Sequence, residues 1–190
     1  MNKTEKVILV NEADQPIGEA EKISAHENAQ CHRAFSVFIL KKINNTINVL
    51  IHQRNPNKYH CGGLWTNTCC GHPRPKEESQ AGAERRLMEE MGIASKLHPA
   101  GKFHYIATFE NGLTENEIDH VFYNFIEHDN FTVNPEEVND FKWLTISSLK
   151  EQLNANPEQF TPWLEQALSL LLKQALGMKN NFVFFVFSLF

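Results

Sequence analysis

The sequence has few basic residues and no long hydrophobic run near its start. Its 190 residues include 18 Lys and Arg against 23 Asp and Glu, a formal net charge of −5. This acidic balance argues against broad electrostatic binding of nucleic acid, so any basic site must be local. The apolar run at 7–10 is too short for a secretory signal or a membrane span. We therefore expect a cytoplasmic globular protein that acts on a small molecule.

Cysteine is scarce, and its placement does not suggest disulfides. Cys31, Cys61, Cys69 and Cys70 lack the spacing of a secreted disulfide framework, so we expect reduced thiols. The vicinal pair 69–70 could form a redox couple, but small buried residues with at most one reactive thiol are the commoner arrangement. No role is assigned to Cys61 or Cys69. Histidine is abundant by contrast, with nine residues, and three of them lie beside the motifs described below.

The pattern of apolar residues predicts several strands and a few helices. Asn44 and Asn45 tolerate positive φ and predict a hairpin turn between two strands. Apolar residues recur at helical spacing over 79–91, and Gly92 follows where a left-handed C-cap belongs. Strands are predicted at 7–10, 34–40, 47–53, 64–68, 103–105, 121–126 and 141–144, and helices at 79–91, 147–153 and 157–176. Without repeats or low-complexity linkers, residues 1–178 are predicted to form one α+β domain with α/β/α layers.

A Phe-rich tail follows this predicted domain at 179–190. It holds five of the 14 phenylalanines and no charge from 180 onward. Its length is well below the ~20 residues of a membrane helix, and its composition is that of an aggregation-prone strand. We therefore expect the tail to pack against the domain or a sister chain, so that it contributes to self-association and not to chemistry.

The strongest motif surrounds the helix predicted at 79–91. Glu89 and Glu90 lie in its last turn, where the helix dipole disfavours negative charge. Arg85 and Arg86 precede them by four residues, so the four side chains could form ion pairs on a solvated face. The alternative is a divalent metal held by carboxylate oxygens, the usual arrangement where a diphosphate must be neutralised.

The spacing decides in favour of the metal. It resembles the Nudix box, G-x5-E-x7-R-E-U-x-E-E-x-G-U with U apolar, and eight of its nine specified positions match. The matching residues are Gly71, Glu77, Arg85, Leu87, Glu89, Glu90, Gly92 and Ile93. The mismatch is Arg86, which stands where a diphosphate hydrolase carries a glutamate associated with its metal and water chemistry. The motif thus keeps diphosphate handling and puts hydrolysis in doubt.

Other segments are similar to one branch of that superfamily. They are Ser24–His26, His32–Ser36, Trp65–Pro73, Glu115–Glu117 and Pro162–Trp163. Together they resemble the type I isopentenyl-diphosphate isomerases over about residues 4 to 176, nearly the whole chain apart from the tail. The resemblance implies a Nudix-type fold, a mixed sheet flanked by helices. It also implies an isomerase of isoprenoid biosynthesis that interconverts isopentenyl and dimethylallyl diphosphate by adding one proton and removing another.

The resemblance also implies two metal ions. Glu115 and Glu117 are two residues apart, so on an extended segment they share one face. Three imidazoles and two carboxylates form a set suited to Zn²⁺ or Mn²⁺, although a lone histidine at any of these positions would more often be an ordinary surface or core residue. In the family, the matching residues build a five-ligand site, here His26, His32, His72, Glu115 and Glu117. A second ion, Mg²⁺, would bridge the diphosphate to Glu90.

Roles for the remaining residues also follow from the resemblance. Each of the matching cations would otherwise be a solvated surface residue. The family pattern implies that the diphosphate is bound by Lys22, Arg54, Lys58 and Arg85. It implies that Cys70 and Glu117 transfer protons, that Tyr105 hydrogen-bonds in that centre and that the indole face of Trp163 stabilises a carbocation. Such an attraction is worth ~2 kcal/mol when desolvated.

Two other functions compete with the isomerase. A Nudix hydrolase of a nucleoside or other diphosphate shares the box, but Arg86 disfavours it and it has no use for Cys70 or Trp163. A non-catalytic, zinc-stabilised binding module would keep the histidines but needs no reactive thiol. Reactivity of Cys70 toward an electrophilic substrate analogue distinguishes the module from the isomerase.

Overall fold

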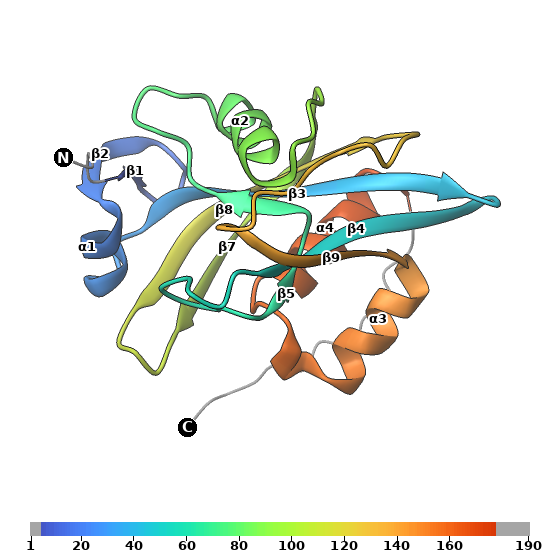
Figure 1. Ribbon diagram of the computed structural model, residues 1–190. Helices are drawn as coiled ribbons and strands as arrows, with labels where there is room; N and C mark the ends of the chain where they lie inside the picture. Colours follow the sequence, from blue (N-terminus) through green and yellow to red (C-terminus); the bar gives the residue numbers. More distant parts are fainter. Residues whose placement is uncertain (1–4, 178–190) are drawn as a thin grey trace.

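A computed structural model describes residues 5–177 (Figure 1). The predicted tail at 179–190 lies outside the described residues. Across 5–177, no helix combines the length and the apolar character needed to cross a membrane. The elements follow one another as β1 (Lys6–Val10), β2 (Pro16–Glu21), α1 (Lys22–Glu27), β3 (His32–Ile43), β4 (Thr46–Arg54), β5 (Trp65–Thr66), β6 (Cys69–Gly71), α2 (Ser79–Met91), β7 (His98–Thr108), β8 (Thr114–Phe125), β9 (Val138–Thr145), α3 (Ile146–Ala155), the 3-10 turn η1 (Pro157–Gln159) and α4 (Leu164–Gln174).

Strand β3 is the centre of a mixed sheet. Along one edge it pairs in parallel with β8, with His32 opposite Glu117, and β8 continues into antiparallel β7. Along its other edge, β3 pairs antiparallel with β1, β6 and β4, one after another. The residues between 32 and 43 therefore collect elements from the whole chain. Because parallel partners present their side chains to the same face, His32 and Glu117 are brought together by this register.

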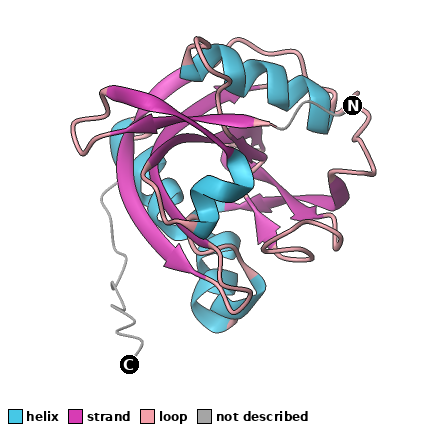
Figure 2. Cartoon of the chain, turned by 90° about the vertical axis from the view of Figure 1, so that its left-hand side faces the viewer, coloured by secondary structure: helices cyan, strands magenta, loops and turns pink. Residues whose placement is uncertain are grey.

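Helices cover both faces of the sheet and make two cores. Alternate residues of β3 point to opposite faces, so Phe35, Val37 and Ile39 pack against α2 while Phe38 and Leu40 pack against α3 and α4. In Figure 1, α2 lies above the strands and α3 and α4 lie below them. Figure 2 shows the curved strands between these helix layers from the side. The predicted α+β class with α/β/α layers is confirmed.

Helix α2 spans the predicted residues, and its C-terminus explains one fixed glycine of the motif. Gly92 adopts φ 67°, and its N–H bonds to the carbonyl of Met88 at 3.0 Å. A Cβ at this position would lie 2.5 Å from the backbone oxygen of Thr132. Both the left-handed conformation and the close approach therefore require glycine here.

Sequence reasoning was wrong or silent at three places. The helix predicted at 157–176 is instead a short 3-10 turn followed by α4, which begins only at Leu164. Thr161 breaks the continuity, because its N–H bonds to the carbonyl of Trp65 and ties this segment to the sheet. Strands β2 and β6 and the six-residue helix α1 were not predicted, and each is too short for a clear periodicity.

Candidate active site

One cavity, at the end of the sheet near α1, gathers most of the residues selected from the sequence. Its walls come from α1, β4, the loop that follows β4, β6, α2, β7, β8 and the start of α4. The predicted residues that line it are Lys22, Arg54, Lys58, Cys70, His72, Glu90, Tyr105, Glu115, Glu117 and Trp163. His26 and His32 are fully buried beside it, and Arg85 is elsewhere. The folded chain thus brings together segments more than 130 residues apart.

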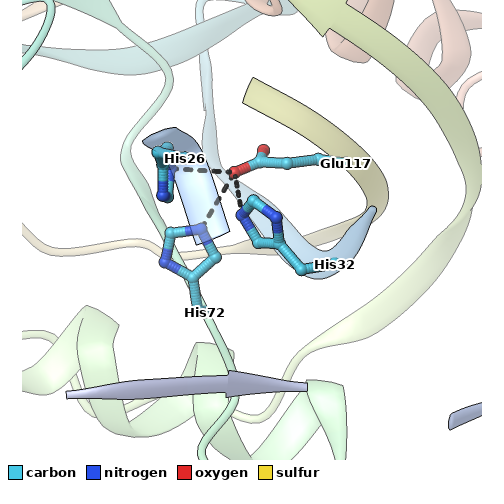
Figure 3. Close-up of side chains that lie close together, drawn as sticks. All are labelled: His26, His32, His72 and Glu117. Atoms are coloured by element: carbon cyan, nitrogen blue, oxygen red, sulfur yellow. Dashed lines mark hydrogen bonds and ion pairs between the residues drawn. The ribbon is translucent and has the colours of Figure 1, made fainter. Parts of the chain in front are cut away.

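Three imidazoles converge on one carboxylate oxygen (Figure 3). The Nε2 atoms of His72, His32 and His26 lie 2.9, 3.2 and 4.0 Å from Oε1 of Glu117. His26 comes from α1, His32 and Glu117 from the paired strands β3 and β8, and His72 from the residue after β6. One donor atom from each of the four residues lies within 4.8 Å of the others, so the group could hold a metal ion.

The hydrogen bonds of two of these rings leave the right nitrogen free for a metal. Nδ1–H of His26 donates to the carbonyl of Lys22 at 2.7 Å, and Nδ1–H of His32 donates to that of Gln30 at 2.8 Å. The Nε2 lone pairs therefore face the carboxylate, and neither Nε2 has a hydrogen-bond partner although both are buried. Lone pairs that face a carboxylate oxygen need a cation between them, so these residues fit a metal ion.

The fifth predicted ligand lies in a second donor group. Glu115 belongs with His26 and His60, and Nε2 of His60 is 3.1 Å from Oε1 of Glu115. The Tyr105 hydroxyl joins the two groups, because it lies 2.8 Å from Oε2 of Glu115 and 2.6 Å from Oε2 of Glu117. The structure therefore brings all five predicted ligands to one region, with His26 common to both groups.

The two carboxyl groups have opposite electrostatics. Burial raises the pKa of Glu117, but the adjacent imidazoles of His32 and His72 outweigh it and hold that pKa well below its usual range. Burial and the neighbouring charge of Glu117 hold the pKa of Glu115 well above its usual range. Glu117 is thus the carboxylate that carries the negative charge in this centre.

Cys70 lies among a cation and an indole. Burial raises the pKa of its thiol to about 12, against the opposing effect of Arg54. The Arg54 guanidinium donates from Nη1 to Sγ of Cys70 at 3.3 Å and lies 5.6 Å from the ring centre of Trp163. Trp163 is held in place by its Nε1–H bond to Oδ1 of Asn67 at 3.1 Å. The thiol is therefore protonated at neutral pH, next to a group that can stabilise a thiolate.

The cations of the cavity are paired with carboxylates. Lys22 bonds to Glu5, and Lys58 bonds to Glu137. Arg54 is buried and instead donates to Cys70 and to the carbonyl of His60. An anionic ligand can exchange with these carboxylates without moving a cation from solvent.

The structure corrects the prediction for Arg85. Its guanidinium makes a two-point ion pair with Glu77, at 2.8 and 2.9 Å, and also reaches Glu89. Arg86 lines the cavity in its place and pairs with the buried Glu90 and, at 3.0 Å, with Glu137. Arg86 lies one helical turn before inward-facing Glu90, whereas Arg85 lies one turn before exposed Glu89, and this periodicity could have separated them.

Further cavity residues were missed altogether. They are Glu5, Tyr59, His60, Asp119 and Glu137, in addition to Arg86. Asp119 continues the alternation of Glu115 and Glu117 on β8, so its place on the same face could have been predicted. The residues of the loop after β4 carry no such periodic signal, and only the folded loop places them inward.

Comparison with known proteins identifies the family. The Nudix domain model matches residues 31–164. Isopentenyl-diphosphate Delta-isomerase 1 of Aromatoleum aromaticum is 44% identical over 169 residues, which cover 88% of this chain and 93% of the relative. The isopentenyl-diphosphate Delta-isomerase of Pectobacterium atrosepticum is 41% identical over 84% of this chain and 87% of its own length.

Solved structures agree on the fold. The crystal structure of DR0079 from Deinococcus radiodurans matches with a TM-score of 0.69 at 20% identity, covering 86% of this chain and 97% of that one. An Ap4A hydrolase complex from C. elegans matches with a TM-score of 0.56 at 17% identity, covering 77% and 98%. At such low identity these structures support the Nudix fold alone. The sequence relatives, together with the geometry above, place this chain in the isopentenyl-diphosphate Delta-isomerase family of the Nudix superfamily.

Proposed function

We propose that this chain interconverts isopentenyl and dimethylallyl diphosphate, with Cys70 and Glu117 as its proton-transfer residues. The observation that carries the assignment of roles is one cavity that combines a protonated thiol, an ionised carboxylate, an indole and several cations. An unactivated alkene is a very weak base, so its protonation needs a positioned acid in a pocket that excludes water. Hydrolysis of a phosphoanhydride has no need for the thiol or the indole.

The thiol and the carboxylate enter the reaction in complementary states. Cys70 holds a proton that it can donate, and Arg54 stabilises the thiolate that remains. Glu117 is ionised and can accept a proton, which Tyr105 helps to hold through its hydroxyl at 2.6 Å. The ring of Trp163 faces the same cavity and stabilises positive charge on the carbon skeleton. In the reverse direction the two proton carriers exchange roles.

The metal centre has a supporting role in this proposal. His26, His32, His72, Glu115 and Glu117 would hold a Zn²⁺ or Mn²⁺ ion, and Glu90 would hold a Mg²⁺ ion that bridges to the diphosphate. When bound, these ions supply positive charge that neutralises the carboxylates and the phosphate oxygens. The four cysteines are free thiols, which supports a reducing, cytoplasmic setting.

The products of the reaction test the proposed function. We expect incubation with isopentenyl diphosphate, Mg²⁺ and a transition metal to give dimethylallyl diphosphate in proton NMR spectra, while phosphorus spectra keep both phosphates of the diphosphate. Release of phosphate or nucleoside monophosphate from a panel of nucleotides, with no isomer formed, would instead support the hydrolase.

The diphosphate contacts give a second prediction. Lys58→Ala removes a cation of the cavity and should raise KM about 10- to 100-fold with little change in kcat, because it weakens substrate and transition state alike. Arg85→Ala is the matched control, since Arg85 pairs with Glu77 outside the cavity and its loss should leave KM unchanged. Steady-state kinetics measure both. A raised KM for Arg85→Ala with an unchanged KM for Lys58→Ala would refute this placement of the diphosphate.

A further inference from the structure

His60 is a buried polar residue of the cavity that the family resemblance does not use. It belongs to the loop between β4 and β5, and its side chain is only 3% exposed. Its ring stacks on Phe109 with centroids 5.1 Å apart and an interplanar angle of 4°. It also lies 5.6 Å from the ring of His26 in a stacked arrangement. The ring is thus fixed between an aromatic wall and a residue of the metal centre.

The backbone holds His60 in this place. The carbonyl of His60 accepts a bond from Arg54 Nη2 at 3.3 Å. The loop closes through Gly63 N–H to the carbonyl of Arg54 at 3.1 Å, and Gly62 passes so near Pro56 that a Cβ would lie 2.4 Å from the Pro56 oxygen. His60 is therefore directed inward by a constrained loop and not by a chance rotamer.

Protein hydrogen bonds do not satisfy the His60 ring. Its Nδ1 is buried without a hydrogen-bond partner among the described residues, as is Nε2 of His26. Unpartnered buried polar atoms are rare and commonly mark a bound water or ion. Two such histidines beside the buried carboxylate of Glu115 therefore indicate a cation.

The spacing of the donor atoms fits one ion. Nε2 of His60 is 3.1 Å from Oε1 of Glu115, close to the 2.9 and 3.2 Å that separate His72 and His32 from Oε1 of Glu117. Donors on neighbouring positions around an ion with bonds of about 2.1 Å are about 3.0 Å apart. The two groups thus have the same local geometry.

The two groups cannot bind separate ions through their shared histidine. His26 donates its Nδ1–H to the carbonyl of Lys22, so only one nitrogen lone pair is available. Tyr105 bonds to both carboxylates and holds the groups side by side. A single ion between the groups satisfies these constraints.

We propose that His60 is a sixth donor residue of the metal centre, so that four imidazoles and two carboxylates hold one transition-metal ion. This inference rests on the metal centre of the proposed function and extends its donor set. Four imidazoles shift the preference further from Mg²⁺ toward Zn²⁺, Mn²⁺ or Co²⁺. The loop that carries His60 also carries Lys58, so metal and diphosphate contacts come from the same loop.

Cobalt binding tests the proposal without relying on activity. Metal-free protein is titrated with Co²⁺ against a chromogenic chelator, and the visible spectrum of the bound ion is recorded. His60→Phe keeps a ring without a donor, and His60→Gln keeps an N–H near the position of Nε2 but is a poor ligand. We expect both variants to lose at least about 10-fold in Co²⁺ affinity and to show the stronger absorption of a lower coordination number.

The controls separate the proposal from its neighbours. His104→Phe replaces an exposed histidine that pairs with Asn116 and should keep wild-type binding. Wild-type affinity and spectrum in both His60 variants would overturn the proposal. A wild-type spectrum in His60→Gln alone would also overturn it, since His60 would then act only by holding Glu115. Retained binding in His72→Ala would contradict the metal centre itself and so the proposed function.

Discussion

Replacing Cys70 by alanine is expected to lower turnover at least ~10²-fold, because it removes a proton carrier that binding energy cannot replace. Cys70→Ser keeps the shape of the side chain but offers a much weaker acid than a thiol, so it should also be slow. Because the lost group acts in the chemical step, the fall should appear in kcat. Steady-state rates with isopentenyl diphosphate measure it.

The control for this prediction is another cysteine of the chain. Cys31 packs beside Ile8 and Val10 and does not line the cavity, so Cys31→Ala should keep wild-type turnover. Thermal unfolding of each variant shows whether a lost rate reflects a lost fold. Near wild-type turnover by a folded Cys70→Ala protein would dismiss the thiol as a proton carrier.

Exhaustive chelation is expected to abolish turnover, since it leaves buried imidazole lone pairs and carboxylates facing one another without a cation. His72→Ala should lower both metal content and rate, because it removes one of the donors around Glu117. Metal analysis of the purified protein, paired with kinetics, tests both parts. Restoration of activity by Mn²⁺ or Zn²⁺ after chelation shows that the protein itself survived.

Glu117→Gln is the companion change, and it is informative when read together with the histidine variant. It removes a metal donor and a proton acceptor at once, so its loss of rate should exceed that of His72→Ala at equal metal occupancy. Full activity of His72→Ala at unchanged metal content would refute the His and Glu site.

The sequence predicted the elements that carry strong local signals. Helix α2 and its Gly92 cap were predicted to the residue, because apolar periodicity and a left-handed glycine are properties of neighbouring residues. Strand β6 was missed, since its three residues are defined only by pairing with β3. The start of α4 was misplaced for a similar reason, because a bond to Trp65 far along the chain interrupts the local helical pattern.

The candidate site shows the same limit. The family pattern named Cys70, Glu117 and the histidines, and the fold brings them to one cavity. Arg85 and Arg86 are adjacent in the sequence, and only the direction of the helix face shows that Arg86 enters the cavity. His60 had no motif to mark it, because its place depends on the closed loop and on the ring of Phe109.

Deuterium incorporation tests the central claim most directly. The reaction with isopentenyl diphosphate is run in D2O with the wild-type protein and followed by proton and phosphorus NMR. Proton transfer by Cys70 and Glu117 predicts dimethylallyl diphosphate with deuterium in its methyl group and no free phosphate. Free phosphate, with no deuterium entering the isoprenoid, would contradict the account.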